Sequence, residues 1–540
     1  MQPRDASRLE SGPFDVLVIG GGIHGLATAY EAASRGLRTA LIDASDFGSG
    51  VTFNHQKTAH GGLRSLQSLR LDRAREAIRE RRALARIAPW FLLPLPFVVG
   101  TYRSATRSRT ALRAGFVLDR WLAKTRNEGV ERELHLPPPR LLSRTLTMKL
   151  FAGINQRNLT GGAQWYDYQM VHNDRLTLAF AAAADRAGAV LVNYVEAVEA
   201  IREGDGVAGM RARNRESGRP LAIRASITIN AAGARAGEVM AMFGASRPLP
   251  LLAAMNLVTS KPAKEIALAA PASGGRMLTL VPWQQRAIVG TSHSRELVPP
   301  ASSRASAAEV DGFIREANEA FPALGLTRQD VTLVHRGLVP AVVGRNGTPD
   351  LRPAPAIYDH AQDQATGAIS IVGVKYTTAR AVAQRTVDTA ARRLGRRLRR
   401  SMTAVTVLPG AGMADHEALA IETARRAHLE LPVNVIQRLS ALYAERSADI
   451  IRLMVDRPEL RRPIVEGSAA TAAEIVYVTR DEMAVHLSDI VVRRTGLGGA
   501  GHPGADVLSA CAQIAAAELG WSEQRQQEEA ASVADIYAIP

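Results

Sequence analysis

Three glycines near the start of the chain, Gly20, Gly22 and Gly25, have the spacing G-x-G-x-x-G. Glycines at this spacing allow a tight turn and a close approach of the backbone to a pyrophosphate group, which the N–H groups of a helix N-terminus attract. Asp43 follows the next apolar run, where a carboxylate can accept hydrogen bonds from ribose hydroxyl groups. These residue types in this order predict a dinucleotide-binding site.

The surrounding residues predict the elements that position this motif. The apolar run over 14–19 predicts a buried strand, the apolar spacing over 23–33 predicts a helix, and the run over 39–42 predicts a second strand that ends at Asp43. A glycine-rich turn alone is weak evidence, because such turns are common. Strand, turn, helix, strand and terminal acid in register are much more specific, and an ordinary tight turn is the weaker alternative.

Two later segments continue the nucleotide-binding pattern. A helix capped by Asn173 or Asp174 is followed by a strand over 190–194, and another strand is predicted over 226–230. The short runs between 249 and 343 are typical of antiparallel strands and predict an inserted substrate domain.

The chain then returns to the nucleotide fold. Residues 367–393 predict a strand, Gly373 and a long helix that starts near Thr377, and the N-terminus of this helix would direct a positive dipole at a bound cofactor. Beyond residue 401 the Ala- and Leu-rich amphipathic segments predict a separate α-helical domain.

Composition limits the class of protein. The chain has 540 residues, 46% of them hydrophobic, which is enough for a large core in two to four domains. The longest apolar stretch, 89–100, is short and contains three prolines, so it predicts no membrane span. The N-terminus lacks the apolar core of a secretory signal, and the single Cys511 allows no intrachain disulfide, so we expect a cytoplasmic location.

The formal net charge of +15 leaves several partners open. The basic residues are spread along the chain without a zinc, helix-turn-helix or RNA-recognition pattern, so we expect no nucleic-acid partner and no metal site. An anionic substrate or an anionic membrane surface explains the charge equally well. The densest basic cluster, 391–400, is typical either of such a contact or of a solvated helix face.

With these segments assembled, the chain resembles the FAD-dependent glycerol-3-phosphate dehydrogenase family, within the amino-acid-oxidase-like superfamily, over nearly its whole length. The matching motifs are the turn at 20–25, KTAHGGLR at 57–64, HNDRL at 172–176, NAAG at 230–233, VPW ahead of VGTSHS, GVKYTTAR at 373–380, and RRTGL with AAAELGW in the tail. The resemblance answers which dinucleotide is bound. It implies FAD, held without a covalent bond because the 57–64 loop contains no cysteine.

The resemblance also implies the fold. We expect an α/β protein with a Rossmann-like FAD-binding domain, an inserted antiparallel-sheet substrate domain and a C-terminal α-helical domain. The implied boundaries are 1–400 for the oxidoreductase region, with FAD-binding parts at 14–90, 163–240 and 365–400 and substrate parts at 91–162 and 241–364, and 401–540 for the helical domain.

The cofactor-binding residues are carried over by motif. The resemblance places Gly20, Gly22, Gly25 and Gly233 near the pyrophosphate, Asp43 at the adenosine ribose, Val195 at the adenine, Lys57, His60 and Gly61 beside the isoalloxazine, and Gly373, Lys375 and Thr377 at the pyrimidine end of the ring. Lys375 and the helix N-terminus could stabilise the negative charge that hydride transfer places at this end.

The substrate-binding residues are Arg64, Arg352, Lys375 and Asn256 by the same resemblance, and the catalytic residues are His60, Lys375 and Arg64. Three positions depart from the family pattern. Val339 replaces an arginine, Asn256 replaces a histidine and Ser65 replaces a tyrosine. Neither Asn256 nor Val339 can act as a base, which leaves His60 and His335 as candidates for that role.

The implied activity is the oxidation of sn-glycerol 3-phosphate to dihydroxyacetone phosphate, with electrons passed to a quinone or another acceptor. The three departures favour an alternative in which the same flavin chemistry acts on another hydroxy compound, such as a polyol or sugar derivative. A non-catalytic flavin-binding or nucleic-acid-binding protein is the remaining alternative, supported by net charge alone. We expect a homodimer in the cytoplasm, with peripheral association at the inner face of an anionic membrane.

Overall fold

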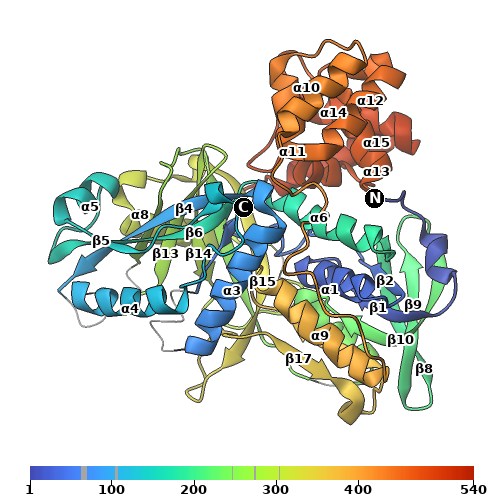
Figure 1. Ribbon diagram of the computed structural model, residues 1–540, viewed down its shortest axis with the longest axis horizontal. Helices are drawn as coiled ribbons and strands as arrows, with labels where there is room; N and C mark the ends of the chain where they lie inside the picture. The colour runs from blue at the N-terminus through green and yellow to red at the C-terminus, as the bar shows by residue number, and fades with distance from the viewer. Residues whose placement is uncertain (63–69, 104–107, 246, 273–274, 303) are drawn as a thin grey trace.

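The computed structural model describes residues 1–540 except 63–69, 104–107, 246, 273–274 and 303. Two large sheets lie side by side and a helical domain sits against them, at the top of the view in Figure 1. The predicted site residue Arg64 and the departure at Ser65 lie outside the described residues.

The first sheet carries the nucleotide motif. Its strands have the order β17-β18-β10-β1-β2-β7, and all neighbours are parallel except the edge strand β17. The bounds are β1 (Phe14–Ile19), β2 (Thr39–Ile42), β7 (Val190–Val192), β10 (Pro220–Asn230), β17 (Ala356–Asp359) and β18 (Ala368–Val372). Val16, Leu17 and Val18 have no exposed surface, as expected for a strand covered on both faces. The predicted strands at 14–19 and 39–42 are therefore confirmed.

Helices cover this sheet and orient the glycine turn. α1 (Ile23–Ser34) follows the turn and packs between α6 (Asn173–Arg186) and α9 (Ala379–Arg393). α6 has His172 at its N-cap, and Asn173 is its first residue. The prediction that Asn173 or Asp174 caps this helix is wrong, because the Asn173 side chain instead donates to the carbonyl oxygen of Thr52.

The second sheet has the strand order β16-β15-β11-β14-β13-β12-β4-β6-β3, with β5 paired to β6. Its bounds are β3 (Thr58–Ala59), β4 (Leu92–Tyr102), β5 (Arg140–Leu142), β6 (Leu159–Met170), β11 (Leu251–Thr259), β12 (Ala267–Pro271), β13 (Met277–Trp283), β14 (Arg286–His293), β15 (Val331–Val343) and β16 (Pro349–Leu351). Pairing is antiparallel except between β4 and β12, which confirms the predicted antiparallel sheet. The apolar stretch 89–100 lies largely in β4, and no helix in the described ranges is long and apolar enough to cross a membrane.

The remaining elements extend or flank the sheets. β9 (Gly206–Asn214) pairs antiparallel with β10, and β8 (Val195–Glu203) pairs antiparallel with β9. The flanking helices are α3 (Leu71–Ile87), α4 (Arg109–Leu122), α5 (Arg144–Leu150), α7 (Ala236–Met242) and α8 (Ala307–Ala320).

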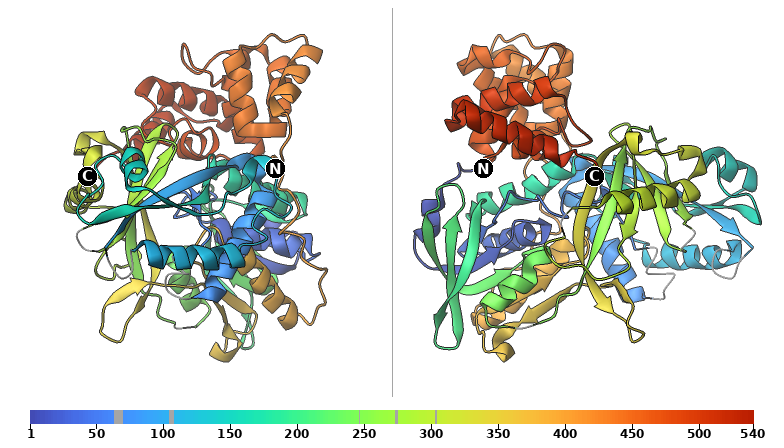
Figure 2. Two further views of the ribbon diagram at one scale, coloured as in Figure 1. Left: turned by 60° about the vertical axis from the view of Figure 1, so that its left-hand side comes forward. Right: turned by 180° about the vertical axis from the view of Figure 1, so that it is seen from behind.

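The C-terminal part is helical, as predicted. Its helices are α10 (His416–Arg426), α11 (Val433–Tyr443), α12 (Ser447–Asp456), α13 (Ala472–Asp481), the π-helix η10 (Asp489–Arg494), α14 (Ala505–Leu519) and α15 (Glu523–Ile536). They share one apolar core, in which Cys511 is fully buried. This domain lies over α6, and the chain end returns to the second sheet, where Ile539 packs against the core formed by β11, β13 and α8 (Figure 2).

Candidate functional site

The glycine turn between β1 and α1 leaves no room for side chains. A Cβ at Gly25 would overlap the carbonyl oxygen of Gly20, and a Cβ at Gly20 would lie 2.6 Å from the carbonyl oxygen of Ala231, with φ of Gly20 at +106°. Gly22 occupies the N-cap of α1 and brings no side-chain cap. The N–H of Gly21 donates to Asp43 and the N–H of Ile23 donates to Thr52 Oγ1 at 3.0 Å. What suits a pyrophosphate here is a turn without side chains at the positive dipole end of α1.

Asp43 lies at the end of β2, beside this turn. Its Oδ2 accepts from the backbone N–H of Gly21 at 2.5 Å, and its Oδ1 accepts from the N–H of Ser45 at 2.7 Å. Burial raises the pKa of Asp43 to about 6. The N–H of Val195 donates to the carbonyl oxygen of Asp43 at 2.7 Å, so the strand predicted to hold adenine adjoins the predicted ribose carboxylate.

Two further strands end at the same sheet edge. β10 runs into Gly233, whose φ of +59° favours glycine, and a Cβ there would meet no atom within 4 Å. β18 runs into Gly373, where a Cβ would overlap the ring of His24 from α1. His24 Nε2 is buried and finds no hydrogen-bond partner among the described residues, and burial lowers the pKa of His24 to about 4. The carboxyl ends of β1, β10 and β18 thus form a glycine-lined cradle of the kind that binds dinucleotides.

The turn after Gly373 carries Lys375 and Thr377. Lys375 is exposed and Thr377 is buried. α9 begins at Ala379 with Thr378 at its N-cap, two residues later than predicted. The positive end of α9 still follows this turn directly, next to the exposed lysine.

His60 lies on the segment just after β3 of the second sheet, and the centre of its ring lies 5.7 Å from that of Phe97 on β4. Its Nδ1 lies 3.0 Å from Asp167 Oδ2, its Nε2 lies 2.9 Å from Thr58 Oγ1, and 51% of its side chain is exposed. Asp167 is buried in β6, and its Oδ1 accepts from the N–H of Gly61 at 2.7 Å and from Arg81. Burial alone would raise the pKa of Asp167, but the hydrogen bond with His60 and the Arg81 charge outweigh it and hold the pKa below its usual range.

Asp167 and Arg81 belong to no motif that marks them as site residues in the sequence. The available signal was the aspartate in YDYQM at 166–170, because a carboxylate among apolar and aromatic residues needs a partner if it is buried. Nothing in the sequence pairs it with His60, which is 107 residues away.

Lys57 and His335 are buried, unlike His60. Lys57 Nζ donates to the carbonyl oxygen of Phe53 and lies 3.9 Å from the centre of the Phe53 ring, and burial lowers the pKa of Lys57 to about 7. Neither ring nitrogen of His335 has a partner among the described residues, and burial holds the pKa of His335 well below its usual value. Of the two histidines considered as a base, His60 is therefore the one that a substrate can reach.

Comparison with known proteins decides the family. Residues 15–389 match the family model described as FAD dependent oxidoreductase, and residues 401–526 match the C-terminal domain of alpha-glycerophosphate oxidase. A glycerol-3-phosphate dehydrogenase of Synechocystis sp. is 31% identical, with 97% of this chain and 96% of that protein covered. Glycerol-3-phosphate dehydrogenase 2 of Mycobacterium tuberculosis is 30% identical, with 95% of this chain and 86% of that protein covered.

The chain belongs to the FAD-dependent glycerol-3-phosphate dehydrogenase family. The predicted resemblance is thereby confirmed, and with it the cofactor, FAD. The X-ray structure of the glycerol-3-phosphate dehydrogenase from Bacillus halodurans complexed with FAD has the same fold, with a TM-score of 0.76, 23% identity, and coverage of 98% of this chain and 96% of that chain.

Two of the positions predicted to depart from the family's substrate-binding pattern lie on the neighbouring strands β11 and β15. Asn256 on β11 lies opposite His335 on β15, is 2% exposed, and accepts from the hydroxyl of Thr291 at 2.7 Å through Oδ1. Val339 on β15 lies opposite the buried, apolar Leu252.

Two arginines lie near Val339. Arg352 donates its backbone N–H to the carbonyl oxygen of Pro340 at 2.9 Å, and its Nη2 donates to the hydroxyl of Tyr358 at 2.9 Å. The Arg336 side chain pairs with Glu309 of α8 at 2.9 Å. Because odd and even strand residues point to opposite faces, Arg336 does not replace the arginine that the family has at position 339.

Proposed function

We propose that this protein oxidises sn-glycerol 3-phosphate to dihydroxyacetone phosphate and passes the electrons to a quinone or another acceptor. Family membership and the names of the full-length relatives support this reaction. The observation that carries it is the His60–Asp167 pair, because it provides a half-exposed base that a buried carboxylate of the substrate sheet holds in one orientation.

His60 would take the proton from the substrate hydroxyl group. With Nδ1–H donated to Asp167, the lone pair of the neutral ring lies on Nε2, which accepts from Thr58 and could accept from a substrate hydroxyl instead. Asp167 would then stabilise the charged ring that proton transfer creates. FAD, when bound, supplies the acceptor for the hydride from the carbinol carbon.

The residues at the carboxyl ends of the first sheet would hold FAD. Gly20, Gly22, Gly25 and Gly233 would admit the pyrophosphate, and Asp43 and Val195 would lie at the ribose and adenine. Gly373 and Thr377 would lie at the ring, together with Lys57, His60 and Gly61 from the segment around β3. Lys375 would place a positive charge at the pyrimidine end, where negative charge develops. The FAD is non-covalent, so acid or heat should release all of the yellow colour.

Arg352, Lys375 and Arg64 would bind the substrate phosphate. The Arg352 guanidinium has five N–H donors, of which Tyr358 engages Nη2, so it has capacity for an anion. Asn256 would contribute a neutral contact in place of the family histidine.

A second function is favoured by the apolar surface around Val339. The loss of a guanidinium there and the engagement of Asn256 with Thr291 fit a substrate with less negative charge, such as a polyol or sugar derivative. The flavin chemistry and the base would stay the same.

We also propose that the protein is cytoplasmic and forms a homodimer. We further propose that it docks peripherally on an anionic membrane through α4. Val117 and Trp121 on this helix are 66% and 67% exposed, and exposed Arg113, Arg120 and Lys124 accompany them. Exposed apolar side chains among cations are typical of helices that lie in a membrane interface.

Anaerobic bleaching of the bound flavin tests the substrate. The purified holoprotein should lose its flavin absorbance rapidly with sn-glycerol 3-phosphate and slowly with glycerol or the enantiomeric phosphate. Faster bleaching by an unphosphorylated polyol would replace the first function with the second.

A further inference from the structure

Asp46 joins the nucleotide-binding loop to the C-terminal helical domain. It lies three residues after Asp43 and is 1% exposed. Arg494 donates two hydrogen bonds to Asp46, Nη2 to Oδ1 at 2.7 Å and Nη1 to Oδ2 at 2.8 Å. Arg493 Nε donates a third to Asp46 Oδ2 at 2.6 Å. Such bidentate, charge-assisted contacts are strong and fix geometry.

The π-helix η10 holds the two arginines in place. Arg493 Nη2 also donates to Asp489 Oδ1 at 2.5 Å, and the hydroxyl of Tyr194 donates to the same oxygen at 2.7 Å. The cluster therefore contains two guanidinium groups and two carboxylates with no exposed charge on Arg494 or Asp46. Burial would raise the pKa of Asp46, but the two arginines outweigh it and hold the pKa below its usual range.

The loop that Asp46 anchors is bonded directly to the glycine turn. Asp43 Oδ2 accepts from the N–H of Gly21, and the N–H of Gly48 donates to the carbonyl oxygen of Gly21 at 3.0 Å. The Phe47 ring covers Gly21 so closely that a Cβ there would lie 2.6 Å from it. A shift of the loop at Asp46 would therefore move both the predicted ribose carboxylate and the pyrophosphate turn.

We propose that Arg493 and Arg494 are positioning residues for FAD, so that the C-terminal helical domain forms part of the cofactor site without contacting the cofactor. The inference rests on the proposed placement of the adenosine ribose at Asp43 and is independent of which substrate is oxidised. It assigns the helical domain a role in retaining FAD, beyond covering α6.

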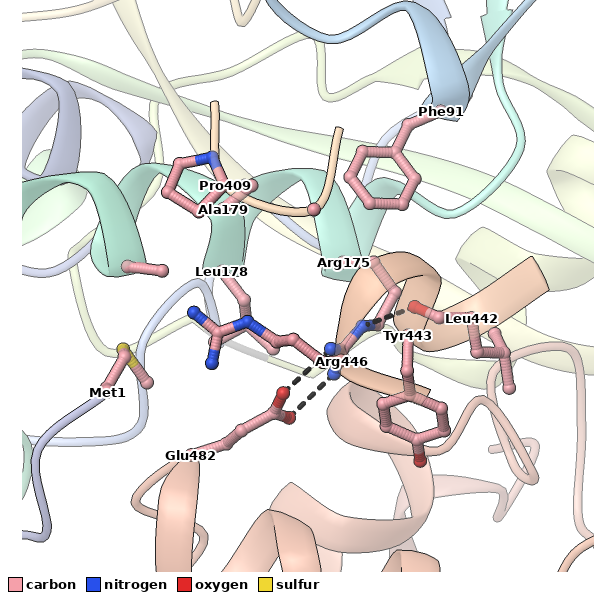
Figure 3. A pocket seen from close by; sticks show the side chains of 12 residues that line it. Met1, Phe91, Arg175, Leu178, Ala179, Pro409, Leu442, Tyr443, Arg446 and Glu482 are labelled. Atoms are coloured by element: carbon pink, nitrogen blue, oxygen red, sulfur yellow. Dashed lines mark hydrogen bonds and ion pairs between the residues drawn. The ribbon is translucent and has the colours of Figure 1, made fainter. Parts of the chain in front are cut away.

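A second ion pair across the same boundary supplies the control. Arg175 of α6 donates to Glu482 at 2.6 and 2.7 Å, and both side chains line a pocket together with Tyr443, Arg446 and Met1 (Figure 3). Glu482 is a buried carboxylate held by a bidentate arginine, as Asp46 is, but the partner of its side chain belongs to α6 and not to the nucleotide loop. Its backbone carbonyl accepts from Arg494 Nε at 3.1 Å, a contact that Glu482→Gln retains.

The experiment compares Asp46→Asn with Glu482→Gln in the full-length holoprotein. The dissociation constant of FAD is measured by the recovery of free-flavin fluorescence on dilution, together with the thermal midpoint. We expect Asp46→Asn to weaken FAD binding about tenfold or more, because a charge-assisted contact that fixes the loop is lost. Glu482→Gln should lower the thermal midpoint with a much smaller change in FAD affinity.

Equal weakening by the two variants, or unchanged FAD affinity in Asp46→Asn, would overturn the proposal. If Asp46→Asn does not fold, the partly exposed Arg493 provides a milder variant, Arg493→Gln, and Arg493→Lys should recover part of the affinity. Hydrogen exchange at 43–50 gives an independent reading, since it should rise in Arg493→Gln and stay unchanged in Glu482→Gln. Substrate bleaching tests the proposed reaction separately, because FAD affinity is measured without substrate.

Discussion

The nucleotide side and the substrate side of the site are built in different ways. On the nucleotide side the closest contacts involve backbone atoms, as between Gly25 and Gly20 and between Gly20 and Ala231. On the substrate side the contacts join side chains from separate strands, as between His60 and Asp167.

This difference determines which side of the site tolerates amino-acid substitution. Backbone contacts leave almost no tolerance for a new side chain, whereas a side-chain position can be replaced while the sheet around it persists. All three departures from the family pattern, at Ser65, Asn256 and Val339, belong to predicted substrate contacts. We infer that specificity can drift in this chain while its FAD site is retained.

Gly25→Ala should break the nucleotide side completely. The added Cβ overlaps the carbonyl oxygen of Gly20, which is backbone and cannot rotate away. We expect a cost above about 4 kcal/mol, the range of severe steric disruption, and loss of bound FAD. Flavin absorbance per chain measures the effect. Gly115→Ala in α4 is the control, because a Cβ there meets no atom within 4 Å, and FAD loss in that variant would contradict a local cause.

His60→Gln should break the substrate side while FAD remains bound. General-base catalysis contributes roughly 10²–10⁴-fold, so anaerobic flavin reduction should slow by that factor. Asp167→Asn removes a charge-assisted contact of about 1.5–3 kcal/mol and should slow reduction less.

The double variant tests whether the two residues act as one unit. His60→Gln with Asp167→Asn should reduce flavin no more slowly than His60→Gln alone, because Asp167 acts through His60. Additive losses, or loss of FAD from Asp167→Asn, would instead assign Asp167 a structural role with Gly61 and Arg81.

The same difference explains what sequence could predict. The glycine spacing predicted the nucleotide turn, and apolar runs placed β1 and β2 correctly, because these signals are local. The start of α9 was predicted two residues early, since the turn between Gly373 and Thr378 has no strong helix signal. The contacts of His60 with Asp167 and of Asp46 with Arg494 span 107 and 448 residues, and only the folded chain brings these partners together.

Lys375→Met tests the point where the two sides meet. The lysine charge is needed mainly when negative charge reaches the flavin. The variant should therefore raise the activation free energy of flavin reduction by about 2.7–4 kcal/mol and change FAD affinity little. Stopped-flow reduction and FAD titration measure the two effects. Lys264→Met, at another exposed lysine, is the control, and an unchanged reduction rate in Lys375→Met would remove Lys375 from the site.

Val339→Arg tests which substrate is bound, because it places an arginine where the family pattern has one on the substrate side. If glycerol 3-phosphate is the substrate, its binding should tighten by about 1.5–3 kcal/mol as the guanidinium reaches the phosphate. If the substrate has changed, the arginine is left without a partner beside Leu252 and lowers the thermal midpoint. Val339→Leu, which stays apolar, is the matched control. If affinity for glycerol 3-phosphate does not rise and the thermal midpoint falls, a polyol or sugar derivative is favoured as the substrate.

The smallest expected effect is the pH dependence of FAD binding, which tests the nucleotide side. Burial raises the pKa of Asp43 to about 6, so the carboxylate that would accept from the ribose gains a proton as the pH falls through 6. Because the ribose hydroxyls donate to the charged form, FAD affinity should be full above pH 7 and fall about tenfold, or about 1.4 kcal/mol, by pH 5. Asp43→Asn should bind FAD more weakly with no such slope. FAD titrations from pH 5 to 8, with the thermal midpoint followed in parallel, separate this effect from acid unfolding, and a flat profile for the unaltered protein would place the ribose elsewhere.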